Sequence, residues 1–148
     1  MICTFFGHRN TERNIEEKLR SVITNLIEYE KVDTFYIGNN GNFDLLAQKI
    51  LKELKNSYQQ INFTIVLAYM PIKKDEYIDY THTIYPDELA YCIPKFSIIK
   101  RNEWMIEKSN YVITYVKRPF GGAYKFKLLA EKKNKIVINL ADEKNCRN

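Results

Sequence analysis

Two periodicities of hydrophobic and polar positions alternate along the chain. Continuous apolar runs, typical of strands buried on both faces of a sheet, are followed by segments in which apolar residues recur every three or four positions, as on one face of a helix. The runs predict strands at Ile2–Phe6, Thr34–Gly38, Phe63–Tyr69, Tyr111–Val116 and Lys135–Leu140. The periodic segments predict helices that begin at Asn10 and that cover Leu46–Leu54, Ser97–Ser109 and Ala123–Lys133.

Regular alternation of strands and helices is typical of a mainly parallel sheet with helices on both faces. We therefore expect an α/β fold, a Rossmann-like three-layer α/β/α sandwich with a mainly parallel five-stranded sheet. Residues 1–141 are expected to form a single domain and 142–148 a C-terminal tail. Ligands of such sheets bind beyond the carboxyl ends of the strands, so the loops at that edge are the place to look for chemistry.

Composition narrows the class of protein. With 148 residues, 45% of them hydrophobic and 28% charged, the chain suits one compact domain and neither a disordered nor a fibrous protein. No apolar stretch is long enough for a membrane span and no secretion signal is visible, so we expect a cytoplasmic protein without a membrane partner. Three widely spaced cysteines without a CxxC pair predict neither a disulfide framework nor a zinc site, and we expect no metal and no cofactor.

All five glycines lie in predicted strand-to-helix loops, at Gly7, Gly38, Gly41, Gly121 and Gly122. Glycine permits tight turns, and it also allows a ligand to approach the backbone where free amides at a helix start attract anions. Each glycine taken alone fits either interpretation. Their joint placement at one edge of the sheet favours a ligand-binding rim.

Two further segments attract attention. In "TFFGHRN" the first apolar run stops at Gly7 and is followed at once by His8 and Arg9, near the expected start of a helix. The connection from Met70 to Phe96 is long and rich in tyrosine, which predicts either a short helix or a functional flap. Its tyrosines fit stacking on a base or ordinary packing equally well, and His82 suits a structural or exposed position better than a catalytic one.

Four motifs together resemble a known superfamily. "TFFGHR", "GNNGNFD", "SIIKRNEWMIEKSNYVITYV" and "FGGAYKF", in this order, are similar to the SLOG superfamily, which groups the Smf/DNA-processing-protein-A Rossmann domain with the "lonely guy" phosphoribohydrolases. The resemblance extends over Ile2–Leu140 and is strongest to small stand-alone SLOG proteins of Firmicutes and their phages. Members include hydrolases, DNA-binding proteins and sensor domains for nucleotide-derived signals in antiphage systems.

The resemblance assigns positions residue by residue. Gly7 falls on the glycine after the first strand, and Gly38 and Gly41 fall on the glycine-rich turn after the second. Arg101 falls on the arginine that binds or polarises the nucleotide in the phosphoribohydrolases. The pair Gly121–Gly122 falls on the first half of their "PGGxGTxxE" signature.

The chain departs from that signature in its second half. Tyr124 replaces the third glycine, Lys125 the threonine and Leu128 the catalytic glutamate. Cleavage of an N-glycosidic bond requires a carboxylate, which leucine cannot supply, whereas Lys125 and Arg101 suit a phosphate. The resemblance therefore favours binding over hydrolysis and leaves enzymatic activity open.

The leading hypothesis is a sensor or sequestering protein for a nucleotide or nucleotide-derived small molecule, of the ADP-ribose or cyclic-nucleotide type, in antiphage defence or phage counter-defence. Cationic residues would contact phosphate or ribose, asparagines would bond polar edges, and Trp104 or a tyrosine of the long connection would stack on a base. Trp104 equally suits helix packing, and Asp44 suits a helix cap. The expected ligand-binding residues are Gly7, His8, Arg9, Gly38, Asn39, Asn40, Gly41, Arg101, Trp104, Gly121, Gly122 and Lys125.

Two other functions stay open. A hydrolase acting on nucleoside monophosphates would need a carboxylate from Glu131, Asp44 or Asp87. Binding of single-stranded nucleic acid is suggested by a pI of about 9.0, and it ranks last because the lysines are spread along the chain. The many tyrosines suit a protein interface, so we also expect a homo-oligomer.

Overall fold

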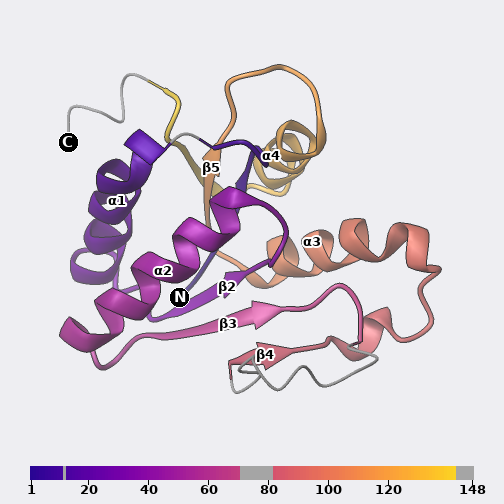
Figure 1. The fold of residues 1–148 in the computed structure, drawn as a ribbon, viewed down its shortest axis with the longest axis horizontal. Helices are drawn as coiled ribbons and strands as arrows, with labels where there is room; N and C mark the ends of the chain where they lie inside the picture. Colours follow the sequence, from indigo (N-terminus) through magenta and orange to yellow (C-terminus); the bar gives the residue numbers. More distant parts are fainter. Residues whose placement is uncertain (12, 71–81, 143–148) are drawn as a thin grey trace.

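A computed structural model of the chain shows a six-stranded sheet covered by helices (Figure 1). The structure describes residues 1–11, 13–70 and 82–142. The strands are β1 (Ile2–Gly7), β2 (Thr34–Ile37), β3 (Asn62–Val66), β4 (Thr83–Ile84), β5 (Tyr111–Tyr115) and β6 (Ile136–Asn139). The α-helices are α1 (Glu16–Glu28), α2 (Asn42–Ser57), α3 (Ser97–Lys108) and α4 (Gly122–Lys132), and single 3-10 turns occupy η1 (Arg13–Ile15), η2 (Asp87–Leu89) and η3 (Pro94–Phe96).

The strands run in the order β4-β3-β2-β1-β5-β6, and every pairing is parallel. In the centre, Cys3 of β1 lies opposite Phe35 of β2 and Tyr111 of β5. The mainly parallel Rossmann-like sheet expected from the sequence is confirmed. Strands β2 and β3 follow one another on one side of β1 in the sheet. The chain then crosses to the other side of β1, where it forms β5 and β6.

The expected strand count of five is wrong by one, because β4 adds a short sixth strand at the edge. It is held by the backbone, since the Ile65 amide donates to the His82 carbonyl at 2.6 Å and the Leu67 amide to the Ile84 carbonyl at 2.8 Å. A two-residue strand is too short to give a hydrophobic period, and pairing with β3 alone decides its existence. Residues 71–81 of the long connection lie outside the described residues.

Two layers of helices enclose the sheet. Cys3 and Phe5 of β1 point into a core formed with α1 and α2, whereas Phe6 points into a core that contains Met105 of α3 and Ala130 of α4. All of these side chains are buried, as a strand covered on both faces requires. Within the described part of the chain, none of the helices combines the length and the apolar character needed to cross a membrane.

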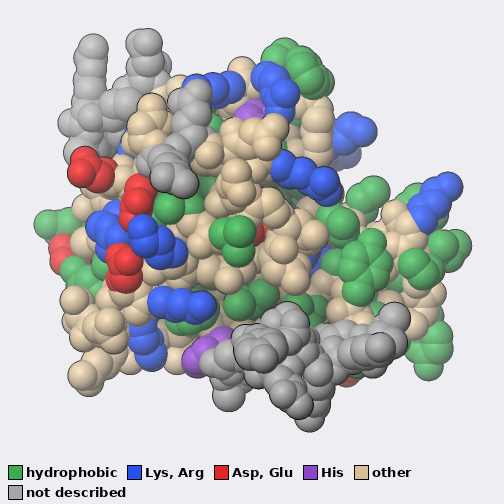
Figure 2. All heavy atoms as spheres, viewed as in Figure 1, with side chains coloured by type: hydrophobic (Ala, Val, Ile, Leu, Met, Phe, Trp, Pro, Cys, Tyr) green, Lys and Arg blue, Asp and Glu red, His purple; other side chains and the backbone are tan. Residues whose placement is uncertain are grey.

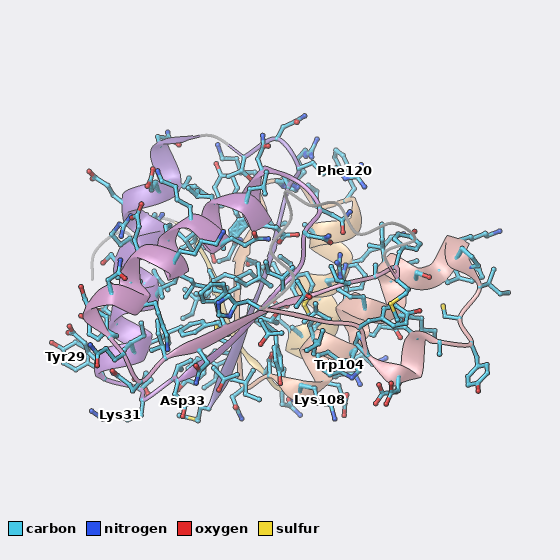
Figure 3. The ribbon with its side chains drawn as sticks, turned by 60° about the horizontal axis from the view of Figure 1, so that its bottom comes forward. Tyr29, Lys31, Asp33, Trp104, Lys108 and Phe120 are labelled. Carbon is cyan, nitrogen blue, oxygen red and sulfur yellow. The ribbon has the colours of Figure 1, made fainter. Side chains whose placement is uncertain are left out.

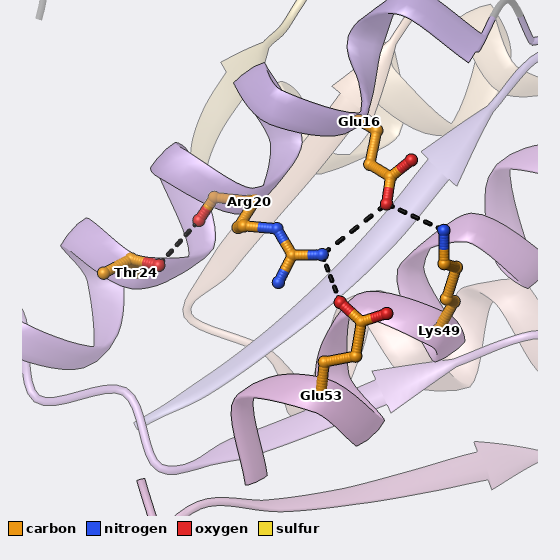
Figure 4. Close-up of polar contacts among 5 residues, drawn as sticks. All are labelled: Glu16, Arg20, Thr24, Lys49 and Glu53. Atoms are coloured by element: carbon orange, nitrogen blue, oxygen red, sulfur yellow. Dashed lines mark hydrogen bonds and ion pairs between the residues drawn. The ribbon is translucent and has the colours of Figure 1, made fainter. Parts of the chain in front are cut away.

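Helices α1 and α2 are also joined across their exposed sides by charges (Figure 4). A carboxylate oxygen of Glu16 lies 2.9 Å from Lys49 Nζ and 3.5 Å from Arg20 Nη2, and the same Arg20 nitrogen bonds Glu53. These side chains are well exposed, so solvent screens the ion pairs and they add little to stability. The network orients the two helices more than it stabilises them.

The first helix begins later than the sequence predicts. Instead of starting at Asn10, α1 starts at Glu16 after the 3-10 turn Arg13–Ile15. The Thr11 hydroxyl donates to the His8 carbonyl at 2.6 Å, a local bond that shapes the loop. His8 and Arg9 therefore lie in a loop at the carboxyl edge of the sheet rather than at the mouth of a helix.

Candidate functional site

A cavity of about 490 Å³ opens at the carboxyl edge of the sheet, beyond β1 and beside α4. The strand order changes direction between β1 and β5, and this topological switch point is where open parallel sheets bind ligands. Its volume suits a small organic ligand. The lining residues are Phe5, Phe6, Gly7, His8, Arg9, Asn10, Asn40, Asp44, Ile98, Ile99, Arg101, Asn102, Met105, Arg118, Gly121, Gly122, Ala123 and Phe126.

One end of the cavity is electropositive. Arg9 from the β1–α1 loop and Arg118 from the β5–α4 loop line it and are exposed. Lys and Arg side chains gather at the upper right of Figure 2, where Figure 1 shows the β5–α4 loop. Arg118 stays close to Phe120, with its guanidinium carbon 5.3 Å from the ring centre.

The same end contains the start of α4. Gly121 has φ of 96°, a conformation that favours glycine, and added Cβ atoms at Gly121 and Gly122 would meet nothing within 4 Å. The amides of Gly122, Ala123 and Tyr124 donate to no acceptor within the part of the chain that the structure describes. An open helix start with unpaired amides attracts anions.

His8 supports the β5–α4 loop. Its Nε2 accepts a hydrogen bond from the Lys117 amide at 3.0 Å, and its Nδ1 lies 3.4 Å from Arg118 Nη2. Burial, and then the charges of Arg118 and Lys117, hold the pKa of His8 below its usual value of 6.5. The imidazole is therefore neutral at pH 7 and orients the loop, whereas Arg9 keeps the charge that an anion needs.

Arg101 is buried at the wall of the cavity and makes four hydrogen bonds to the protein. Its Nε donates to Asn102 Oδ1 at 2.7 Å, its Nη1 to the Val66 carbonyl at 3.1 Å and to Asn39 Oδ1 at 3.3 Å, and its Nη2 to Asn40 Oδ1 at 2.9 Å. Only 2% of the residue is exposed. Arg101 thus holds the β2–α2 loop against α3, and the two asparagines are its partners.

Asp44, in the first turn of α2, lines the cavity with 8% of its surface exposed. Its Oδ2 accepts a hydrogen bond from the Asn40 amide at 3.0 Å. Burial raises the pKa of Asp44 to about 6, against the opposing effects of that amide and of Arg101. Of the three carboxylates named as catalytic candidates, it alone lines the cavity: Glu131 pairs with Lys127 at 2.7 Å on the surface, and Asp87 is exposed on η2.

The glycines of the first two loops have packing reasons. A Cβ at Gly7 would lie 2.3 Å from the ring of the buried Phe43, and one at Gly38 would lie 2.8 Å from Asp44 Oδ2. Gly41 has φ of 97° and lies against Arg9, whose Cα would be 3.2 Å from an added Cβ. These glycines make room for protein atoms, whereas Gly121–Gly122 face open space.

Two expected binding residues lie away from the cavity. Trp104 packs on Tyr36 with ring centres 5.2 Å apart and carries Lys108 Nζ at 5.8 Å from its ring centre. Figure 3 shows Trp104 and Lys108 on the side of the molecule opposite Phe120. Lys125 is exposed on α4 outside the lining, and Leu128, where the resemblance places a glutamate, is 43% exposed and also outside it.

Several lining residues escaped the sequence analysis. Arg118 follows the strand of Tyr111–Tyr115 in a strand-to-helix loop, and its position there was a usable signal. Ile98, Met105 and Phe126 belong to the apolar stripes of α3 and α4 and look like ordinary core residues in the sequence. Only the packing of the helices shows that these side chains also form a cavity wall.

Comparisons with known proteins give one informative result. No family model and no curated protein sequence matches the chain. The solved structure of DNA processing protein A (DprA) from Streptococcus pneumoniae is similar, with a TM-score of 0.64 and 18% sequence identity over 91% of this chain. The chain spans 48% of that protein's length. The likeness shows that the two chains share a Rossmann-like α/β fold.

Proposed function

We propose that the protein binds a nucleotide or nucleotide-derived small molecule in the cavity beyond β1 and β5. The observation that carries the proposal is the electropositive end of the cavity, where Arg9, Arg118 and the open start of α4 converge. Two arginines and unpaired helix amides form the chemistry that holds a phosphate.

The rest of the lining suits the other parts of a nucleotide. Ile98 and Met105 of α3 and Phe126 of α4 form an apolar wall, against which a planar base can pack. Asn10, Asn40 and Asp44 offer hydrogen-bonding groups on the opposite elements. A phosphate site, a polar wall and an apolar wall in one cavity match a nucleotide better than a simple anion.

A sensing or sequestering role follows from the chain's departure from the phosphoribohydrolase signature at Leu128. The resemblance to SLOG proteins of Firmicutes and their phages suggests that the ligand is a signal of the ADP-ribose or cyclic-nucleotide type, used in antiphage defence or in counter-defence. A homo-oligomer in the cytoplasm is part of the same proposal.

A thermal-shift and calorimetry screen with mono-, di- and cyclic nucleotides and ADP-ribose tests the proposal. At least one compound should raise the melting temperature. Arg9→Ala and Arg118→Ala should each weaken its binding about tenfold. Lys132→Ala, which removes the same charge from the far end of α4, should leave binding unchanged. A blank screen, or equal losses in all three variants, contradicts the proposal.

Cleavage of the ligand is a second candidate, favoured by Asp44 in the cavity. A partly buried carboxylate with a pKa of about 6 is suited to proton transfer near neutral pH. Incubation of the protein with nucleoside monophosphates should then release free base, and Asp44→Asn should abolish the release while Glu131→Gln keeps it. The absence of any release excludes this candidate for those substrates.

The same screen should include single-stranded DNA, because the similar solved structure is named as a DNA processing protein. Binding of single-stranded DNA through Arg9 and Arg118 would weaken steeply with salt. Binding of a mononucleotide relies on fewer phosphate contacts and should vary much less. The slope of affinity against salt therefore separates the two ligands.

A further inference from the structure

One oxygen of Asp44 has no hydrogen-bond partner. Its Oδ2 is taken by the Asn40 amide at 3.0 Å, whereas its Oδ1 has no partner among residues 1–11, 13–70 and 82–142. Asp44 is 8% exposed as a residue, and it lines the cavity. Oδ1 is an acceptor with no partner in the described protein, so a donor that enters the cavity can bond it in place of solvent.

The neighbouring Arg101 already uses four of its five N–H groups within the protein. Arg101, the cation nearest to this carboxylate in the fold, gives hydrogen bonds to Asn39, Asn40, Asn102 and the Val66 carbonyl. Among the described residues, no ion pair within 4.0 Å joins Arg101 to Asp44. Burial lowers the pKa of Arg101, while the charges of Asp44 and Tyr69 act in the opposite direction. The charge of Arg101 favours the ionised form of Asp44 without bonding to it. Oδ1 is therefore available to bond a ligand.

We propose that Asp44 Oδ1 accepts a hydrogen bond from a ribose hydroxyl of the bound nucleotide, so that the site selects ribonucleotides over 2′-deoxyribonucleotides. This inference rests on the proposed function. It assigns Asp44 as a specificity-determining residue, a role distinct from phosphate binding and from proton transfer.

We assign the ribose as the partner of Asp44 because of where Asp44 lies in the cavity. On one side, the β2–α2 loop that precedes it touches the Arg9 loop, since the Asn42 amide donates to the Arg9 carbonyl at 3.1 Å. On the other side, Asp44 approaches Arg101, which lies one turn from Ile98 and Met105 on the same face of α3. Asp44 is thus bracketed by the phosphate end and by the apolar wall. The sugar is the part of a nucleotide that lies between its phosphate and its base.

A base amine is the other donor that Asp44 could accept from, and one substitution separates the two. In Asp44→Asn the amide oxygen keeps the bond from the Asn40 amide, which turns the amide NH₂ toward the ligand. A hydroxyl can accept from this NH₂, so binding of a ribonucleotide survives. A base amine is a donor only, so a ligand that bonds through it would be repelled.

The experiment measures dissociation constants of AMP, GMP, CMP and UMP and of their 2′-deoxy counterparts by calorimetry at pH 7.5. Wild-type protein should bind a ribonucleotide about tenfold more tightly than its 2′-deoxy form, because the deoxy form leaves the carboxylate unpaired. In Asp44→Asn this preference should fall below about threefold, because a hydrogen bond between the neutral amide and the hydroxyl is worth less than one to a carboxylate. Glu88→Gln, an exposed carboxylate outside the cavity, should keep the wild-type ratio.

Each other outcome contradicts the inference. Equal ratios in wild-type protein and Asp44→Asn show that Asp44 does not read the sugar. Loss of AMP binding in Asp44→Asn, together with retained binding of purine riboside 5′-monophosphate, assigns the bond to the base amine. If wild-type protein binds none of these monophosphates, the ribose assignment is overturned, and the proposed function itself falls only if the wider nucleotide screen is also blank.

Discussion

The β2–α2 loop and the β5–α4 loop end in glycines of the same backbone conformation but have different surroundings. Each ends in a glycine that caps the following helix, Gly41 with φ and ψ of 97° and 173°, and Gly121 with 96° and 176°. Neither helix start has a side-chain cap. The first loop is nevertheless filled by protein, whereas the second is open.

The difference lies in what reaches each loop from the rest of the fold. Arg101 bonds Asn39 and Asn40 in the first loop, and the Arg9 carbonyl takes the first amide of α2. In the second loop, the space around Gly121–Gly122 stays empty. A glycine-rich turn before a helix is thus compatible with a structural joint or with an anion site, and its neighbours decide which of the two it becomes.

The largest expected effect contrasts the arginines of the two loops. Arg101→Met should lower the free energy of unfolding by about 3 kcal/mol, because it leaves the buried Val66 carbonyl and the buried Asn102 Oδ1 without their donor. Arg118→Met removes an exposed side chain and should change it by less than about 0.5 kcal/mol. Urea denaturation measures both values, and similar losses in the two variants would remove the distinction between the loops.

The second prediction concerns pH and the carboxylate beside the filled loop. The pKa of Asp44 rises from 3.8 to about 6 on folding, so the folded protein holds this proton more tightly than the unfolded chain does. Its contribution to stability is complete below pH 4 and is lost as the pH rises through about 6, a difference of about 3 kcal/mol.

Asp44→Asn has no proton to lose at this site and isolates the effect. Measured by urea denaturation, its stability relative to wild-type protein should improve between pH 4 and pH 7.5 by up to about 3 kcal/mol. The comparison between the two proteins cancels the titration of the other carboxylates. A stability difference that does not vary with pH would show that Asp44 titrates normally.

The smallest expected effect compares two glycines. A methyl group at Gly38 would lie 2.8 Å from Asp44 Oδ2 and 3.1 Å from the guanidinium carbon of Arg101, so Gly38→Ala should cost about 2 kcal/mol of stability. Gly122→Ala places its methyl in open space at the first position of α4 and should change stability by about 0.5 kcal/mol or less, or improve it slightly. Thermal denaturation of the pair checks the contrast, which disappears if both loops tolerate alanine.

The sequence was a good guide wherever a local pattern was long enough. The apolar runs of Ile2–Phe6 and Tyr111–Val116 became the neighbouring strands β1 and β5, and the helix expected over Ser97–Ser109 is α3, Ser97–Lys108. These segments carry their own hydrophobic period, which tertiary packing reinforces. The strand Thr83–Ile84 and the 3-10 turn that delays α1 to Glu16 have no such period, and they were missed.

The candidate site was predicted only in part, for a similar reason. The structure brings Gly7, His8, Arg9, Asn40, Arg101 and the pair Gly121–Gly122 to the cavity. It leaves Gly38, Asn39, Gly41, Trp104 and Lys125 outside the lining. The residues that follow β1 line the cavity, whereas Gly38 and Asn39, which follow β2, do not. The direction of a helical side chain such as that of Trp104 depends on how its helix packs.

The sequence by itself determined the order of strands and helices and the edge of the sheet where charged residues and glycines meet, because both follow from local periodicity and from the geometry of parallel strands. Only the tertiary structure decided what those residues do. Folding buries Arg101 between the β2–α2 loop and α3, and it lowers the pKa of His8 and raises that of Asp44. It leaves Arg118 and the start of α4 exposed. Burial and neighbouring charge set these properties, and both depend on contacts between segments far apart in the chain.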